Sequence, residues 1–429
     1  MARPPGPLRG KPLSKPNCSH HENLANDMKL TIPRTEFLTA LAAVKPVARA
    51  SSLPILSNLL LVASTKPGAG SVALTATDTD IHLRVNREAT VVKEGKTTVR
   101  ADLLFDIVRM AEGADVKLEL QKNNLLVECG AARHCLTTIA PEDFPPFPRI
   151  QAKDGQNGPP GSGVTELALE DSLFRTMLAE TSFAASTEEE RFILCGCLVK
   201  FDGGQLHVVA CDGRRIAVSS VDSPVTTAAQ SLVLPVKAVR ELMRLLGSDT
   251  DKPRRLSVTA GTNLVQFSLG AAHTGTTLVS KLIEGNYPAY AKIMPPEQAI
   301  ANLPRADLLR AIERIALVAD EVTLEFTGST LHLRSHGKRG QDMIGEASDS
   351  LHISASVQAP LESTFSTRFL RDTLSAIADD TLEFHLAPGR PCLFKAPTRD
   401  WRAVIAPVKK AEGRKAAAKP EEKQPEAKK

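Results

Sequence analysis

The chain has 429 residues, 42% of them hydrophobic and 24% charged, a globular composition that is long enough for about three domains. Its net charge of +4 comes from the two ends, because residues 409–429 hold eight Lys and Arg against four Asp and Glu, and residues 1–27 hold four against two. The seven Cys lack the spacing of a zinc site or a disulfide framework, and no apolar stretch is long enough to span a membrane. We therefore expect a cytoplasmic protein with no membrane partner.

The two ends also differ in composition from the rest of the chain. Residues 1–27 are rich in Pro and Gly and contain no apolar segment of a signal peptide, and residues 409–429 consist mainly of Ala, Lys, Glu and Pro. Such segments bury too little apolar surface to fold, so both are predicted to be disordered extensions. A strand pattern begins directly at Met28, where we expect the folded body to start.

Between these ends the same order of elements occurs three times. An amphipathic helix is predicted at 34–44, 170–182 and 305–317, and a second helix, introduced by a strand, lies within 97–113, 232–247 and 363–379. Short alternating strands fill the intervals, and matching positions are occupied by Arg100, Pro235 and Ser366. A period of this length indicates tandem α+β domains, each with two helices and antiparallel sheets, rather than a solenoid of short repeats.

Segments typical of linkers divide the repeats. Residues 154–164 are rich in Gly, Pro and Ser, and residues 294–304 contain three Pro. The predicted domains are therefore 28–150, 164–296 and 297–408.

Each repeat contains an elbow, in which an apolar strand runs into a polar turn and a second strand follows. The copies lie at 72–85, 206–220 and 331–347. In the second copy the turn carries Arg214 and Arg215, whose guanidinium groups are predicted to project beside the apolar strand. This elbow is the leading candidate for a functional site.

Basic residues recur at one-turn spacing on the predicted helices. Lys237, Arg240 and Arg244 share a face next to an apolar stripe, and Arg310 and Arg314 lie one turn apart on another helix. Such a face would follow DNA phosphates without reading base edges. An ordinary solvated face would show the same pattern, so the charges alone leave both interpretations open.

Sequence motifs of catalytic chemistry are missing. The chain has no Gly-rich phosphate loop, HExxH or GxSxG. Asp78 and Asp80 form a DxD that would suit a divalent cation, but no third carboxylate is near and a turn is the simpler interpretation. Cys195 and Cys197 are predicted to share one face of a strand, and the remaining Cys in strand-like runs are read as small buried hydrophobes. We expect no catalytic residue, no metal and no cofactor.

Six segments, taken together, resemble the bacterial DNA sliding clamp family, the beta subunits of DNA polymerase III. They are SSLPILSNLLL (51–61), VALTATDTDI (72–81), PEDFPPFP (141–148), VACDGRRIAV (209–218), VKAVRELMRLL (236–246) and LIEGNYPAYAKIMP (282–295). The likeness extends in order over 28–408. It implies three tandem copies of the DNA-clamp domain per chain and a homodimer that closes a six-domain ring around duplex DNA.

The resemblance implies a non-catalytic processivity factor. Such a ring would hold double-stranded DNA without sequence preference and would tether the catalytic subunit of DNA polymerase III, the clamp loader, other polymerases and repair proteins, in the cytoplasm at the nucleoid. Two alternatives stay open: a clamp-like scaffold with a different partner set, and a metal-dependent DNA-processing enzyme that uses Asp78 and Asp80.

The resemblance also implies a pocket for a short apolar partner peptide between the second and third domains. Arg214 stands where the family usually has His, so the rim of this pocket would be more cationic. The matching positions are Leu194, Cys211, Gly213, Arg214, Arg215, Ile216, Pro288, Tyr290, Lys292, Ile293, Ser366, Phe369, Arg390, Cys392, Val404, Ile405, Ala406, Pro407 and Val408.

DNA contacts and the ring interface are expected at further positions. At the interface, a strand with His134 and Leu136 in the first domain would face Leu317 and Val318 of the third domain in the other chain. The expected DNA-contacting residues are Arg49, Arg100, Lys237, Arg240, Arg244, Arg310, Arg314 and Arg368.

Overall fold

The computed structural model describes residues 27–48, 53–65, 70–150, 165–223, 230–247, 252–271, 274–296, 299–335, 338–339, 342–343, 345–355, 360–386 and 390–408. The predicted C-terminal tail, Arg49 and the N-terminal extension up to residue 26 lie outside these ranges. The chain forms two compact units. The first contains residues 1–45, 50–74 and 87–144, and the second contains residues 46–49, 75–86 and 145–429.

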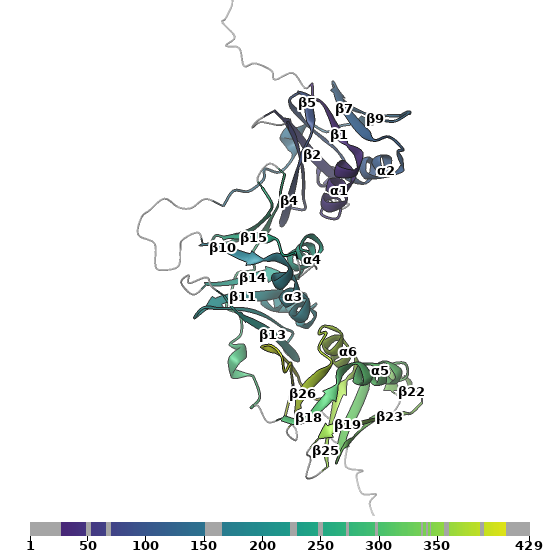
Figure 1. The fold of residues 1–429 in the computed structure, drawn as a ribbon, viewed down its shortest axis with the longest axis vertical. Coiled ribbons are helices and arrows are strands. Elements are labelled where there is room, and N and C mark those ends of the chain that lie inside the picture. Colours follow the sequence, from purple (N-terminus) through teal and green to yellow (C-terminus); the bar gives the residue numbers. More distant parts are fainter. Residues whose placement is uncertain are drawn as a thin grey trace, which may run out of the picture. The chain divides into compact units, whose positions relative to one another are not determined.

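The first unit packs two helices against antiparallel sheet (Figure 1). β1 (Lys29–Pro33) leads directly into α1 (Arg34–Val44), and β6 (Gly95–Arg100) leads into α2 (Ala101–Met110). One sheet has the order β5-β1-β7-β8-β9, so β9 is an edge strand, and β2 pairs with β6. The other elements are η1 (Pro54–Ser57), β2 (Asn58–Ser64), β5 (Thr90–Lys93), β7 (Asp115–Gln121), β8 (Asn124–Cys129), β9 (Ala132–Thr137) and η2 (Pro141–Asp143).

Two further strands are divided between the units, namely β3 (Ser71–Thr77) and β4 (Ile81–Glu88). Residues Ile81–Val85 of β4 belong to the second unit and pair there with β17 (Thr276–Lys281).

The second unit begins with a repeat of the same plan. β10 (Thr165–Glu170) leads into α3 (Asp171–Thr181), and β14 (Gln230–Pro235) leads into α4 (Val236–Leu245). This half also contains η3 (Ser182–Ala184), η4 (Glu189–Cys195), β11 (Gly196–Asp202), β12 (Gln205–Cys211), β13 (Arg215–Asp222), β15 (Arg255–Ala260), β16 (Leu264–Leu269) and η5 (Tyr290–Lys292).

The plan then recurs in the C-terminal half of the second unit. β18 (Ala299–Pro304) leads into α5 (Arg305–Ile315), and β25 (Leu361–Ser366) leads into α6 (Thr367–Ser375). The other strands are β19 (Glu321–Thr327), β20 (Thr330–Ser335), β21 (Lys338–Arg339), β22 (Asp342–Met343), β23 (Ala347–His352), β24 (Ser354–Ala355), β26 (Thr381–His385), β27 (Cys392–Lys395) and β28 (Trp401–Ile405).

A nine-stranded sheet joins the two halves of the second unit. Its order is β14-β11-β12-β13-β28-β27-β26-β18-β24, and every pairing recorded within it is antiparallel. The joint is the pairing of β13 with β28, which runs from Arg215 opposite Ile405 to Ser219 opposite Trp401. The C-terminal half also contains a separate four-stranded sheet in the order β23-β20-β19-β25, in which β23 is an edge strand.

All six predicted helices form, and their boundaries follow the sequence signals. Arg100, Pro235 and Ser366 each stand directly before the second helix of a repeat, as their matching positions predict. None of the helices in the described ranges combines the length and the apolar composition that a bilayer-spanning helix requires.

Two expectations about cysteines are wrong. Cys195 ends η4 and Cys197 lies on β11, so they do not share a strand face, because the strand begins only at Gly196. Cys135 is exposed, since it lies on the edge strand β9. The other strand cysteines, Cys129, Cys211 and Cys392, are buried as expected.

An arginine on the first helix of each repeat ties down the end of the second helix. The last carbonyls of an α-helix have no intrahelical donor, and a cation is favourable at that end of the helix dipole. The bonds join Arg34 to the Val108 and Arg109 oxygens (2.9 and 2.8 Å), Arg175 to the Met243 oxygen (3.1 Å) and Arg305 to the Leu374 and Asp379 oxygens (3.2 and 2.8 Å). The same kind of contact, from an arginine of the first helix to main-chain oxygens at the end of the second, thus orients the helix pair in all three repeats.

Replacing Arg305 with Met should therefore destabilise the second unit. Because two bonds from a charged donor are lost, we expect the free energy of unfolding to fall by about 1–3 kcal/mol, measured by urea denaturation. Arg310→Met on the same helix is the matched control, since Arg310 is exposed and pairs with the exposed Asp307, and it should leave the urea midpoint unchanged. Equal effects of both substitutions would contradict the capping role.

Candidate functional site

A buried apolar cluster lies at the joint between the two halves of the second unit. Leu194, Cys211 and Ile216 come from η4, β12 and β13, and Leu393 and Val404 come from β27 and β28. Each of these side chains is at most 9% exposed. The rest of the cluster consists of Leu198, Val209, Val218, Val233 and Ile283, with Ile193, Tyr287, Tyr290 and Met294 packed against it.

The structure therefore brings together five of the residues predicted for the peptide pocket, namely Leu194, Cys211, Ile216, Tyr290 and Val404. Their contribution to peptide binding stays a prediction.

β27 and β28 each present one face to this cluster and the other to a separate core. Leu393 and Val404 belong to the cluster at the joint, whereas Cys392 and Ile405, both fully buried, belong to the core of the C-terminal half. Side chains alternate between the two faces of a strand, so neighbours in sequence end up in different cores. The sequence reasoning included Cys392 and missed Leu393, although the two-residue period would have signalled that they point in opposite directions.

The closing strand is held against the elbow by main-chain hydrogen bonds. The β13–β28 register ends with Arg215 opposite Ile405, and the Ala406 amide then donates to the Arg214 oxygen at 2.8 Å. The Val408 amide donates to the Thr364 oxygen at 2.8 Å, and Ala406 to Val408 are half-buried. The predicted residues at the end of the closing strand therefore lie beside the elbow.

The elbow between β12 and β13 is a tight turn built on Asp212. Its carboxylate accepts hydrogen bonds from the backbone amides of Arg214 (2.8 Å) and Arg215 (2.9 Å), as in an Asx turn. Gly213 has φ of +86°, and a Cβ there would lie 2.6 Å from Nη1 of Arg191. Glycine is therefore required at this point of the turn.

Arg215 is buried, contrary to the expectation that it projects from the elbow. Its side chain is 5% exposed and makes ion pairs from Nε to Asp212 (3.0 Å) and from Nη1 to Asp372 of α6 (2.9 Å). The guanidinium group also lies 4.6 Å from the ring centre of Phe369 and 5.5 Å from that of Phe183. These partners explain the burial, since a charge leaves water only when it is paired. Arg215 thus links the two halves of the unit.

The residues predicted for the rim of the pocket include exposed cations. Arg214, Lys292 and Arg390 are exposed, and the apolar side chain of Ile293 is 52% exposed. The remaining predicted rim residues, Pro288, Ser366 and Phe369, are half-buried. An exposed apolar side chain among positive groups beside a buried cluster suits a ligand that is apolar and carries negative charge.

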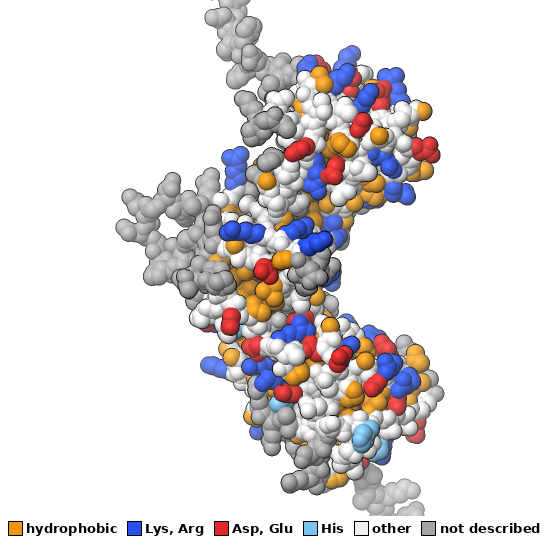
Figure 2. All heavy atoms as spheres, viewed as in Figure 1, with side chains coloured by type: hydrophobic (Ala, Val, Ile, Leu, Met, Phe, Trp, Pro, Cys, Tyr) orange, Lys and Arg blue, Asp and Glu red, His pale blue; other side chains and the backbone are white. Residues whose placement is uncertain are grey.

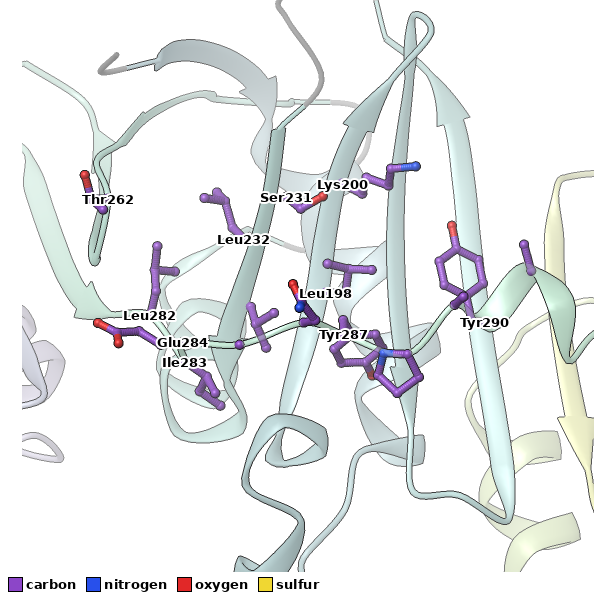
Figure 3. A pocket seen from close by; sticks show the side chains of 16 residues that line it. Leu198, Lys200, Ser231, Leu232, Thr262, Leu282, Ile283, Glu284, Tyr287 and Tyr290 are labelled. Carbon is purple, nitrogen blue, oxygen red and sulfur yellow. The ribbon is translucent and has the colours of Figure 1, made fainter. Parts of the chain in front are cut away.

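A pocket of about 600 Å³ adjoins the cluster (Figure 3). The segment from Leu282 to Ala291 crosses strands β14 and β11, and the Ile283 amide donates to the Val233 oxygen at 2.9 Å. The hydroxyl of Tyr287 accepts a hydrogen bond from the Cys211 amide at 3.0 Å, and burial raises the pKa of this tyrosine. Of the predicted peptide-binding residues, Pro288 and Tyr290 line this pocket.

Six of the predicted DNA-contacting residues lie on helices and Arg100 ends β6 directly before α2, whereas Arg49 lies outside the described residues; most of the described ones are neutralised locally. Carboxylates pair with six of them, so the charge alternates in sign, and on the face drawn in Figure 2 Lys and Arg side chains likewise lie among Asp and Glu side chains. No carboxylate in the described part of the chain lies within ion-pair distance of Arg240. The pairs are Arg100–Asp102, Lys237–Asp78, Arg244–Glu241, Arg310–Asp307, Arg314–Asp349 and Arg368–Asp372.

The structure brings three of these basic residues together. Lys237, Arg240 and Arg368 line one cavity of about 880 Å³ in the second unit. Their role in DNA contact stays a prediction.

Asp78 and Asp80 form a turn, as the simpler interpretation held. Asp78 accepts hydrogen bonds from the amides of Asp80 (3.1 Å) and Ile81 (2.9 Å). The carboxylate of Asp78 pairs with Lys237, and that of Asp80 pairs with Lys281 at 3.0 Å. Within the described ranges there is no group of three or more His, Cys, Asp or Glu side chains that could hold a metal ion.

The residues expected at the ring interface lie at edges. His134 is exposed on edge strand β9, while Leu136 on the same strand is 7% exposed. In the second unit Leu317, just after α5, is 70% exposed, and Val318 is half-buried against the core. Exposed apolar side chains and unpaired strand edges are features of a surface that another chain can cover.

Comparisons with known proteins agree with this geometry. Models of the DNA polymerase III beta subunit match in order, with the N-terminal domain at residues 28–148, the central domain at 168–289 and the C-terminal domain at 291–409. The beta sliding clamp of Escherichia coli K12 is 30% identical over 369 residues, which cover 84% of this chain and 93% of that protein. The beta sliding clamp of Caulobacter vibrioides NA1000 is 30% identical over 387 residues, covering 86% and 96%.

A solved structure shows the same fold. The sliding clamp (DNA polymerase III subunit beta) of Bartonella birtlesii, bound to griselimycin, is 27% identical with a TM-score of 0.78, and the match covers 89% of this chain and 100% of that chain.

The burial of Arg215 and the exposure of Arg214 give a paired test. Arg215→Met leaves Asp212 and Asp372 without their buried partner, so we expect the free energy of unfolding to fall by about 3–5 kcal/mol. Arg214→Met removes the same charge from an exposed position and should change stability by less than about 0.5 kcal/mol. Thermal and urea denaturation measure both, and a stable Arg215→Met variant would show that the ion pairs do not hold the joint.

Proposed function

The chain belongs to the family of the DNA polymerase III beta subunit, and we propose that it is a sliding clamp, the processivity factor that keeps a replicative polymerase on DNA. The observation that carries this proposal is the succession of three matching domains over residues 28–409, each with the same pair of helices held together by an arginine. The alternative of a clamp-like scaffold with a different partner set is not favoured, because the curated relatives are named beta sliding clamp.

Two chains would close the ring head to tail. A contact between the first domain of one chain and the third domain of the other joins two different surfaces, and two such contacts complete a closed dimer. The edge strands β9 and β23 are suited to this contact because each has one unpaired side. The exposed side chains of His134 and Leu317 lie at these ends, and we propose that they are covered in the dimer.

The helices would face the DNA and hold it weakly. Phosphate contacts depend on the number of cations that are free to release counterions, and here most cations already have a carboxylate partner. A ring does not need high affinity, because its retention comes from encirclement. Near-neutral helices therefore suit a protein that must slide along any sequence.

The cluster at the joint would receive partner proteins. Apolar groups of a short peptide would pack beside Leu194, Ile216 and Val404, and Arg214 and Lys292 on the rim would attract acidic groups of the peptide. We expect the catalytic subunit of DNA polymerase III, the clamp loader, and other polymerases and repair proteins to bind here in turn. Griselimycin, which is bound in the Bartonella birtlesii clamp, is expected to bind this chain at the same place.

The proposed function needs no catalytic step. The metal-dependent enzyme that was the other alternative would use Asp78 and Asp80, yet lysines pair with both carboxylates. We expect a non-enzymatic protein that acts in the cytoplasm at the nucleoid.

Encirclement is tested by loading the protein onto a nicked circular DNA with a clamp loader and then cutting the circle. We expect the protein to stay on the circle through gel filtration in high salt and to leave after a restriction enzyme linearises the DNA. A circle without the restriction site, treated with the same enzyme, is the control. Equal retention on circular and linear DNA would indicate ordinary affinity binding and would rule out the ring.

The helix face is tested by replacing Lys237, Arg240 and Arg244 together with Ala. We expect the dimer to persist and contact with DNA to weaken at low salt, with a salt dependence reduced by up to about three charges. The matched variant replaces Lys29, Lys96 and Lys117, three exposed lysines on strands, and should behave like the wild type. If loading and sliding of the helix variant match the wild type at both low and high salt, the DNA face lies elsewhere.

A further inference from the structure

An ionic network closes the joint between the second and third domains on the same face of β13 as Arg215, because Ser219 lies four residues after Arg215 on that strand. The side chains of Glu180 and Asp379 are 4% and 9% exposed, and that of Arg399 is 35% exposed. Arg399, in the turn between β27 and β28, pairs with Glu180 of α3 at 2.5 Å and with Asp379, which follows α6, at 2.6 Å. The Glu180 carboxylate also accepts a hydrogen bond from the Ser219 hydroxyl of β13 at 3.1 Å. Thr398 donates to Asp379 at 2.6 Å. One arginine thus connects a helix of one domain to a helix end of the other.

Trp401 reinforces the same contact through the main chain. This side chain is fully buried, and its indole N–H donates to the backbone oxygen of Glu180 at 3.1 Å. Beside it, the Ser220 amide of β13 donates to the Asp400 oxygen at 2.9 Å. The β27–β28 turn is therefore fixed to α3 and to β13 at once.

Glu180 carries the most deeply buried charge of the network. Its side chain is 4% exposed, and burial raises the pKa of its carboxyl group while the charge of Arg399 opposes that rise. In the described part of the chain Arg399 is the one cation that pairs with Glu180, and a buried carboxylate that loses its partner must gain water or a proton in its place.

The network and the peptide pocket are built on the same two strands. Ser219 pairs with Trp401, and Ile216 pairs with Val404, three positions further along the same ladder or about 10 Å away. A rotation of β28 against β13 at Trp401 would therefore move Val404 and Leu393 relative to Leu194 and Ile216. The spacing of the two walls of the pocket therefore depends on the angle between β13 and β28 at Trp401.

We propose that Arg399 and Glu180 are positioning residues of the partner pocket. They hold the second and third domains at the angle at which the pocket accepts its ligand, and they do so without touching the ligand. This inference rests on the proposed function, because it assigns a further role at the same site.

The experiment uses the full chain, with griselimycin as the probe. Its affinity is measured by isothermal titration calorimetry well below the unfolding temperature, so that every variant is folded. Trp401 supplies a second measurement, because it is the single Trp of the chain and its fluorescence reports the joint directly. We expect Arg399→Met to weaken griselimycin binding about tenfold and to shift Trp401 emission to longer wavelength.

Four further variants separate positioning from general stability. Arg399→Lys keeps the cation and should recover part of the affinity, and Glu180→Gln/Arg399→Met should recover more because the buried Glu180 charge is removed together with its partner. Glu180→Gln alone is the milder test if Arg399→Met does not fold. Arg254→Met is the matched control, since Arg254 pairs at 2.7 Å with buried Asp171 inside the second domain; it should lower the unfolding temperature yet leave Trp401 emission and griselimycin affinity unchanged.

The outcomes are distinct. Wild-type affinity and unchanged Trp401 emission in Arg399→Met, or in Glu180→Gln where only that variant folds, would overturn the inference, and so would an equal loss of affinity in Arg254→Met. If the wild-type chain itself did not bind griselimycin, the proposed pocket would be wrong and the positioning role would fall with it.

Discussion

The pairing of β13 with β28 is the constraint on which the functional part of this molecule depends. It joins the strands of two domains into one nine-stranded sheet, while each domain keeps its own pair of helices. Strands that share hydrogen bonds cannot change register without breaking several buried bonds together. The apolar cluster, the Asp212 elbow and the Arg215 and Arg399 ion pairs are all arranged around this one ladder. The proposed partner pocket thus depends on two domains held in register.

Charge in this protein is used mainly for orientation and little for net attraction. Arginines cap helix ends in every repeat, and Arg215 and Arg399 bridge domains, so many cations have structural partners. On the helix faces proposed to meet DNA, carboxylates stand next to most of the basic groups. Exposed pairs of this kind are weak and exchange easily with other anions. Such pairs suit the proposed sliding, in which DNA phosphates are contacted but none is held tightly.

The elements that depend on local pattern could be predicted from the sequence. The helices, the repeat, and the positions of Arg100, Pro235 and Ser366 before second helices follow from periodicity and turn residues. Contacts between residues that are far apart in the sequence could not be predicted in this way. Arg215 was expected at the surface because its partner Asp372 is 157 residues away in the sequence, and no local pattern indicates that the two residues pair.

The same limit explains the other differences. Glu180 and Arg399 drew no attention because each is an ordinary charged residue until the fold joins them. The family resemblance supplied the pocket, but it could not tell Cys392 from Leu393, which point to opposite faces of one strand.

That alternation has a consequence for how this part of the chain can vary. Along β27 and β28, pocket-facing and core-facing side chains follow each other one by one, so inserting or deleting a single residue would turn Val404 into the core and Ile405 into the pocket. Substitutions at one face leave the other untouched, whereas length changes damage both. Changes in the proposed partner preference are therefore expected as substitutions within β27 and β28, whereas insertions are tolerated only beyond the end of β28.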